Sequence, residues 1–298
     1  MAEARSVVIT GASRGLGFAS AVRLYSRGWH VIAAMRSPDD GLERLRAATG
    51  AAPGDSRLTA VRLDLTDGAS ITDAGKAVTE AAGAPHVVVH NAAYVTVGCV
   101  EEVPSHLAER IFSTNVLGPI RLTRELLPAM RAAGRGRFVV ISSVGGIRGM
   151  PTTSLYSATK GAIERWAEAL AQEIAPFGLG VSVVSTGTFR TDVYDENHTT
   201  SYADPHGAYG PLHAALARTG QRVIRSAKPP EDFAVALEKV LAADAPFARH
   251  LIGSETRAMM MASRLLPAAA FHSLARAATG LPRPRTLRML EDAGPAGT

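Results

Sequence analysis

The chain has 298 residues, of which 46% are hydrophobic and 20% charged, a composition typical of a globular protein and not of a disordered or fibrous one. Its net charge of +5 arises from 32 basic and 27 acidic residues without a block of like charges, so we expect no nucleic-acid partner. The single cysteine, Cys99, excludes an internal disulfide framework. The sequence has neither the residue order of a signal peptide nor a run of ~20 apolar residues, so we expect a cytoplasmic protein; contact of Met259–Met261 with a membrane surface is the less favoured alternative.

Short apolar runs alternate with helical patterns along most of the chain. The runs do not alternate with polar residues, which is typical of a parallel sheet covered on both faces. The order of the elements predicts an α/β fold, a doubly wound parallel sheet of the Rossmann type with about seven strands and helices on both faces. The predicted strands are Ser6–Thr10, His30–Met35, Leu58–Leu65, His86–Asn91, Arg137–Ser143, Gly180–Ser185 and Arg249–Ile252, and the first helices are Gly15–Arg27, Ser70–Ala82, Pro104–Met130 and Ser154–Pro176.

The pattern becomes less regular after Ser185. Residues 186–212 are rich in Thr, Gly, Pro, Tyr and His, which predicts a long functional loop or lid within a substrate loop over 186–225. We expect residues 94–100, 144–155 and the C-terminal extension to contact the substrate as well. Pro229–Ala243 has the prolines and acidic residues of a helix start. We therefore expect a catalytic domain over residues 1–254, followed by a helical extension over 255–298 that is interrupted by Pro267 and ends in a frayed tail, Glu291–Thr298.

The first strand is followed by a glycine-rich turn, "VVITGASRGLGFAS". Gly11, Gly15 and Gly17 permit a tight turn and a close approach of the backbone to a ligand, and the helix that follows offers free N–H groups to a pyrophosphate. Such a triplet is weak by itself, because glycines also occur in ordinary turns. Its position between a strand and a helix predicts a dinucleotide site.

The end of the second strand indicates which dinucleotide is bound. A site for NAD usually has an acidic residue here that binds the ribose 2′-hydroxyl, but this chain has Met35 followed by Arg36, and Arg14 lies inside the glycine turn. Two guanidinium groups without a carboxylate suit a 2′-phosphate. The alternative is that Arg36 only faces solvent; with both arginines present, we predict NADP (NADPH) in preference to NAD.

Tyr156 and Lys160 are four residues apart in "YSATK", so a helix would place them on one face. An ammonium about 4 Å from a phenol favours the phenolate by about 4 kcal/mol at an effective dielectric constant of 20. That energy would lower the phenol pKa by about three, enough for proton transfer near neutral pH. A pair of this kind standing alone is usually a surface pair, and only its occurrence together with the glycine turn favours catalysis.

The motifs "TGASRGLG" and "YSATK" resemble those of the short-chain dehydrogenase/reductase family, and the resemblance extends from about Val7 to about Asp244. It implies that Tyr156 is the general acid and base, that Lys160 lowers its pKa and binds the nicotinamide ribose, and that Ser143 orients the carbonyl group. It also implies that Asn115, in "IFSTNVLG", anchors a water that connects Lys160 to solvent, while the cofactor supplies the hydride. Ser142 is the weaker alternative to Ser143.

The same resemblance implies which residues bind the cofactor. Asp64 would contact the adenine, and Gly187, Thr188 and Thr191 the nicotinamide amide and the phosphates. The full set is Gly11, Ser13, Arg14, Gly15, Leu16, Gly17, Arg36, Asp64, Leu65, Asn91, Ala92, Tyr156, Lys160, Gly187, Thr188 and Thr191. The chain departs from the family pattern where His90 replaces an asparagine, Ala93 a glycine and Thr186 a proline; the last change leaves its loop less stiff.

Within the family, "SSVGGIRGMPTTSLYSATKGAIE" and the C-terminal extension look most like the branch that acts on steroids, retinoids and similar lipophilic carbonyl compounds. We therefore expect a large apolar ketone or aldehyde, or the corresponding alcohol, as the substrate. The family also implies a homodimer through the helices that contain Asn115 and Tyr156, or a tetramer of two such dimers.

Other functions remain open at this stage. The chain could be a ketoreductase of a polyketide, acyl-thioester or other natural-product pathway, or a non-catalytic sensor of the NADPH/NADP⁺ ratio; a sugar epimerase or dehydratase usually has another glycine spacing and a longer substrate domain. We predict no metal, because the histidines form no metal-ligand spacing with carboxylates or with Cys99. The histidines considered are His86, His90, His198, His206, His213 and His272.

Overall fold

The computed structural model of the chain describes residues 5–191 and 200–281. Two of the sequence predictions fall elsewhere: the frayed tail Glu291–Thr298, and residues 192–199 of the predicted substrate loop, which include His198, lie outside the described residues.

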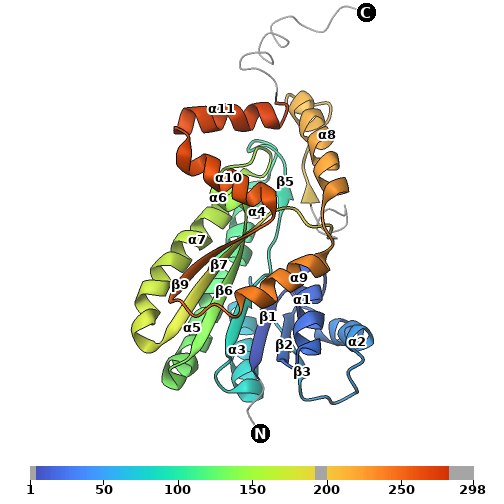
Figure 1. Cartoon of the computed structure of the whole chain (residues 1–298). Coiled ribbons are helices and arrows are strands. Elements are labelled where there is room, and N and C mark those ends of the chain that lie inside the picture. Colours follow the sequence, from blue (N-terminus) through green and yellow to red (C-terminus); the bar gives the residue numbers. More distant parts are fainter. Residues whose placement is uncertain (1–4, 192–199, 282–298) are drawn as a thin grey trace, which may run out of the picture.

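A parallel sheet of seven strands forms the centre of the protein, in the order β3-β2-β1-β4-β6-β7-β9 (Figure 1). All of its strand pairs are parallel, as the sequence predicted. The chain builds the sheet outward from β1 to one edge, then returns to place β4 on the other side of β1, so the order reverses between β1 and β4. The strands are β1 (Ser6–Thr10), β2 (His30–Met35), β3 (Leu58–Arg62), β4 (Val87–His90), β6 (Gly136–Ser143), β7 (Leu179–Thr186) and β9 (Phe247–Ile252).

Most strand positions are apolar because both faces of the sheet are buried, and the buried serines of β7, Ser182 and Ser185, have hydrogen-bond partners. Successive side chains of a strand point to opposite faces. In β1, Val8 belongs to one core cluster while Val7 and Ile9 belong to the other, and all three are fully buried. An alternating polar position would place an unpaired polar group in one of the two cores.

Helices cover each face and so complete a three-layered structure (Figure 1). On one face Ile163 of α7 packs against the sheet, and on the other Phe233 of α9 does so beside α1. The first layer contains α3 (Gly68–Ala82), α4 (Ser105–Phe112), α5 (Gly118–Ala133) and α7 (Ser154–Ile174), and the second contains α1 (Gly15–Ser26), α2 (Pro38–Thr49) and α9 (Pro230–Val240).

The helix predicted over Pro104–Met130 is one helical stretch that contains a π-helical turn, Ser113–Leu117, between α4 and α5. The sequence pattern did not reveal α2. The pattern also did not predict the helix α8, which Gly210–Ser226 form within the segment interpreted as a loop. The loop prediction was wrong there because α8 follows a segment rich in Gly, Pro and Thr, while its own Ala, Leu and Arg residues favour a helix that begins at Gly210 with proline in its first turn.

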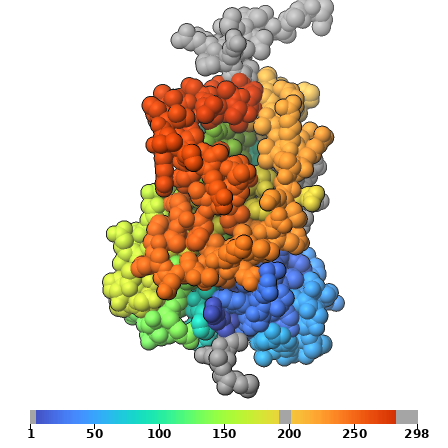
Figure 2. Space-filling view, in the orientation of Figure 1, coloured from blue at the N-terminus to red at the C-terminus, as the bar shows by residue number. Residues whose placement is uncertain are grey.

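The remaining elements gather at the carboxyl end of the sheet (Figure 1). They are the short helix α6 (Val144–Ile147), the two-stranded pair β5 (Thr96–Val97) and β8 (Thr200–Ser201), the helix α8, and the C-terminal helices α10 (Ser254–Leu265) and α11 (Ala268–Ala278). The break at Pro267 confirms the predicted interruption of the C-terminal helix pair. In the view of Figure 2, α8, α10 and α11 form the outer surface over this end. None of the helices within the described residues is both long and apolar enough to cross a membrane.

Candidate active site

A groove lies at the carboxyl ends of the strands, where the strand order reverses. This is the position at which doubly wound sheets bind ligands. The groove consists of two adjoining pockets, which share Arg14, Ala93 and Val95. The first pocket is lined further by Gly11, Ser13, Met35, Arg36, Leu63, Asp64, Leu65, Thr66, Ala92, Tyr94, Arg110 and Thr114, and the second by Gly15, Leu16, Asn91, Ile141, Ser142, Ser143, Tyr156, Lys160, Thr186, Gly187, Phe189 and Thr191.

The glycine turn follows β1 and can be built only from glycines at two of its positions. Gly11 has a φ of 69°, and a Cβ on it would lie 2.9 Å from the Cα atom of Ala92. A Cβ on Gly17 would lie 2.3 Å from the carbonyl oxygen of Gly11. Gly17 therefore lets α1 approach the turn closely, although it does not itself line the groove.

The start of α1 suits an anionic ligand. Arg14 occupies the N-cap position, and neither a side-chain cap nor an acidic residue satisfies the first turn. The first N–H groups of a helix have no partners within the helix, and the helix dipole adds a partial positive charge there. The turn thus fits the pyrophosphate of a dinucleotide in both shape and charge.

Asn91 and Thr10 hold the turn against β4. The Asn91 side chain donates from Nδ2 to the carbonyl oxygen of Thr10 at 2.9 Å. The Thr10 hydroxyl accepts from the backbone N–H groups of Asn91 and Ala92, both at 3.0 Å. The role of Asn91 visible in the structure is therefore to fix the backbone of the glycine turn.

The first pocket combines three arginines with one carboxylate. Met35 is buried and its sulfur packs against Gly41 of α2, so the end of β2 presents Arg36 to the pocket beside Arg14 and Arg110. Asp64 accepts two hydrogen bonds from Thr66, at 2.7 and 2.9 Å. Burial raises the pKa of the Asp64 carboxyl, but the bonds from Thr66 and the charges of Arg36 and Arg110 together hold the pKa below its usual value, so it stays ionised.

The second pocket contains Tyr156 and Lys160 of α7. The Lys160 ammonium donates to the carbonyl oxygen of Ile141 at 2.7 Å and lies 5.5 Å from the centre of the Tyr156 ring. Burial lowers the pKa of Lys160 from 10.5 to about 8, while the Glu164 carboxylate acts in the opposite direction. The side chain therefore remains mostly protonated at neutral pH, as a group that tunes a phenol requires.

The two serines at the end of β6 have different surroundings. Ser142 is buried and donates to the Glu164 carboxylate at 2.6 Å. Ser143 is partly exposed, and its hydroxyl accepts from the backbone N–H of Gly145 at 3.2 Å, which caps α6. A hydroxyl that accepts one hydrogen bond can still donate. Ser143 thus has a proton to offer in the groove, whereas that of Ser142 is already engaged.

Asn115 lies behind the groove in the π-helical turn and is buried. Its Oδ1 accepts from the backbone N–H of Tyr94 at 2.7 Å. Its Nδ2 donates to the Tyr94 carbonyl at 2.9 Å and to the Thr159 hydroxyl at 3.0 Å. Both amide hydrogens are therefore used, and they tie the segment after β4 to the residue that precedes Lys160.

The remaining predicted residues are placed as follows. Gly187 and Thr191 border the second pocket, but Thr188 is not among the described residues that line either one. His90, which departs from the family pattern, is buried against Phe138 and shares a hydrogen bond of 2.9 Å with Thr123. Burial lowers the pKa of His90 to about 4, so it is neutral at physiological pH.

Sequence reasoning missed a buried charge network behind Lys160. Glu164, only 2% exposed, accepts from Arg249 of β9 at 2.7 Å as well as from Ser142. Arg249 also pairs with Glu168 at 2.9 Å. The spacing could have indicated Glu164, which follows Lys160 by four residues, but its partner lies 85 residues further along the chain.

A second cluster that the sequence did not predict lies under α8. His213 and Glu102 form a pair at 2.8 Å, and the two residues are 111 positions apart. Cys99, His213 and Glu102 could approach one metal ion, in contrast to the expectation from spacing. Glu102 already accepts from the backbone N–H of Cys99 and of Asp204. These bonds explain the cluster as a link between α8 and the loop after β5.

Fold and groove together define the class of the protein as a dinucleotide-binding oxidoreductase. Residues 5–201 match the family model described as short chain dehydrogenase. The chain is 32% identical to human 17-beta-hydroxysteroid dehydrogenase type 1 over 256 residues, covering 83% of this chain and 77% of that protein. The chain therefore belongs to the short-chain dehydrogenase family, as its motifs suggested.

Solved structures agree with this assignment. A short-chain dehydrogenase from Streptomyces avermitilis superposes with a TM-score of 0.77 at 30% identity, covering 99% of this chain and 100% of that one. A short-chain dehydrogenase/reductase from Burkholderia phymatum in complex with NAD gives a TM-score of 0.73 at 26% identity, covering 88% and 92%. Related proteins thus bind a nicotinamide dinucleotide on this fold.

Proposed function

We propose that the protein is an NADP(H)-dependent oxidoreductase that interconverts a ketone or aldehyde and the corresponding alcohol on a large, mostly apolar substrate. The observation that carries the proposal is the second pocket, in which Ser143, Tyr156 and Lys160 adjoin the glycine turn. Gly11, Gly15, Arg14, Arg36 and the other residues of the groove would hold the cofactor. When bound, NADPH supplies the hydride.

The protein's own residues supply the proton and the electrostatic stabilisation. Tyr156 donates a proton to the carbonyl oxygen as the carbon accepts hydride, and takes it back in oxidation. Lys160, positively charged and buried, stabilises the tyrosinate that is left. Ser143 donates a hydrogen bond to the oxygen as negative charge develops on it.

Lys160 must then be reconnected to solvent, and we assign this role to a water near Asn115. Both amide hydrogens of Asn115 are engaged and its Oδ1 accepts from Tyr94, so we assign the water to the backbone carbonyl of Asn115. Four residues later the chain has Pro119, which lacks an N–H and cannot form the usual helical bond to that carbonyl. The π-helical turn at this point follows from the same interruption.

The preference for NADP rests on charge. Arg14, Arg36 and Arg110 border the first pocket, and both Arg36 and Arg110 act on Asp64. A 2′-phosphate can be bound by guanidinium groups through charge-assisted, bidentate bonds. Met35 offers no carboxylate for the 2′-hydroxyl that NAD would present.

The decisive experiment replaces Tyr156 with Phe and follows NADPH absorbance with a panel of ketones, retinal and keto-steroids. We expect turnover to fall by about 10²- to 10⁴-fold while NADPH binding, followed by fluorescence, is unchanged. Tyr25→Phe is the matched control, because it removes a phenol hydroxyl that bonds Asp55 far from the groove. Normal turnover in Tyr156→Phe would refute the mechanism, and tight NADPH binding without any turnover in the wild type would favour a redox sensor.

Two further properties are part of the proposal. We expect a homodimer through α4, α5 and α7, the helices around Asn115 and Tyr156, or a tetramer of two dimers, and sedimentation analysis of the full chain tests this. A cytoplasmic location would suit an enzyme that draws on a reduced NADP pool.

A further inference from the structure

Arg148 is a partly buried cation without a partner among the described residues, immediately beyond the catalytic serine. Its Nε is buried and forms no hydrogen bond, and no ion pair within residues 5–191 and 200–281 involves its guanidinium. Burial alone lowers the pKa of Arg148, and no carboxylate counteracts this. Leaving a charged group partly desolvated and unpaired is costly, so such a group calls for an explanation.

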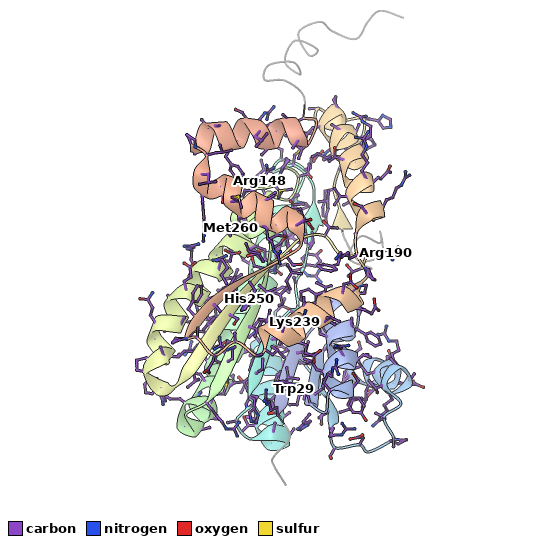
Figure 3. The ribbon with its side chains drawn as sticks, viewed as in Figure 1. Trp29, Arg148, Arg190, Lys239, His250 and Met260 are labelled. Atoms are coloured by element: carbon purple, nitrogen blue, oxygen red, sulfur yellow. The ribbon has the colours of Figure 1, made fainter. Side chains whose placement is uncertain are left out.

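The position of Arg148 connects it to the active site. Arg148 ends α6, the single helical turn that Ser143 caps. A Cβ on Gly145, in the same turn, would touch the Tyr156 ring at 3.5 Å. The four residues of α6 therefore separate Arg148 from Ser143. Figure 3 shows Arg148 at the level of α10, which packs against α6.

The neighbouring elements provide no anion for Arg148. Neither α6 nor the connection Gly149–Thr153 contains an acidic residue. In α10 the acidic residue Glu255 lies against Gly187, where a Cβ would collide with its carboxylate. In α7 the nearest carboxylate, Glu164, is bound by Arg249 and Ser142. The anion that would satisfy Arg148 is therefore not among the described groups of the protein.

We infer that Arg148 binds an oxyanion, a carboxylate or a phosphate, at the end of the substrate remote from the reacting carbonyl. This rests on the proposed function and deepens it: the substrate is an amphipathic carbonyl compound, with an apolar body and an anionic end. A guanidinium offers two parallel N–H groups to the two oxygens of such an anion. The bond would orient the substrate and not take part in proton or hydride transfer.

The test uses a matched pair of ligands, 10-oxoundecanoate and its methyl ester, which share the ketone and the chain but differ in charge. Binding to the full-length protein with NADP⁺ is measured by calorimetry, and kcat/KM is measured with NADPH. We expect the acid to bind about 10- to 100-fold more tightly than the ester, as for a hydrogen bond to a charged group. Arg148→Met should abolish this difference, whereas Arg148→Lys should retain part of it.

Arg264→Met is the control, because it removes an exposed arginine from α10 and so tests a general effect of positive charge. Decanoate and decyl phosphate, used as competing ligands, identify the preferred oxyanion. Equal binding of acid and ester by the wild type, undetectable binding of both, or an equal loss for both ligands in Arg148→Met would overturn the inference. Preferential binding of the acid without turnover would uphold it, while the proposed reduction would fail.

Discussion

Replacing Glu164 with Gln should destabilise the protein and change its pH profile, although Glu164 lies outside the groove. The carboxylate is buried and accepts from Arg249 at 2.7 Å and from Ser142 at 2.6 Å. Removing one member of a buried ion pair usually costs about 3–5 kcal/mol. Gln can still accept from Ser142, and Arg249 retains Glu168, so we expect the free energy of unfolding to fall by about 2–3 kcal/mol.

The same substitution should move the basic limb of the kcat/KM profile to lower pH. The Glu164 carboxylate raises the pKa of Lys160, opposing the burial that brings it to about 8. Without that negative charge, and with the Arg249 guanidinium paired only with Glu168, the pKa of Lys160 falls further. The charged lysine that the mechanism needs is then lost at a lower pH.

Urea unfolding and pH–rate profiles measure the two effects, and Glu168→Gln is the matched control. Glu168 also pairs with Arg249, but its side chain is 29% exposed, so its loss should cost no more than about 1 kcal/mol. If Glu164→Gln and Glu168→Gln lost the same stability and shared the wild-type pH profile, the role given to the buried network would be wrong.

Three other predictions follow from the groove. Gly17→Ala places a Cβ against the Gly11 carbonyl, so it should cost about 1–3 kcal/mol of stability and abolish NADPH binding; a calorimetric titration like that of the wild type would contradict this. Arg36→Leu should raise the KM for NADPH about tenfold and leave that for NADH unchanged, and steady-state kinetics with both cofactors measures the ratio. Lys160→Met should stabilise the cofactor-free protein at pH 7 by up to about 3 kcal/mol, because burial lowers the lysine pKa from 10.5 to about 8. This gain in the free energy of unfolding should shrink as pH rises from 8 to 10.5. A gain that does not depend on pH, measured by urea unfolding, would contradict this prediction.

The sequence predicted the sheet well because its central strands are buried on both faces and are therefore mostly apolar. Ser6–Thr10 and His30–Met35 were predicted with the bounds that the structure has. The helix α8, of 17 residues, was not predicted, because the Gly- and Pro-rich segment before it extended the loop assignment over residues that favour a helix. The loop prediction rested on the amino-acid composition of the residues before α8, and that composition does not extend through the helix.

The candidate site was predicted where its residues lie in short motifs, and missed where they meet only in the folded chain. Glu164 shares a helix face with Lys160, so its position was readable, but its burial and its pairing with Arg249 were not. Arg148 lies in residues 144–155, a segment expected to contact the substrate, but no pattern distinguished it from its neighbours. Arg148 stands out only because it lacks a partner among the described residues, and a local sequence pattern cannot predict this.

The fold brings together arginines that are dispersed in the sequence, and this explains part of the positive charge of the chain. Arg14, Arg36 and Arg110 are far apart in the chain, so the excess charge looked dispersed, yet all three border one pocket. Arg249, in contrast, is matched by two carboxylates inside the protein. Arg249 therefore serves the stability of the fold, whereas three arginines beside the single carboxylate of Asp64 leave the first pocket with an excess of positive charge. Arg148 has no carboxylate partner among the described residues, so we expect that the substrate carries negative charge.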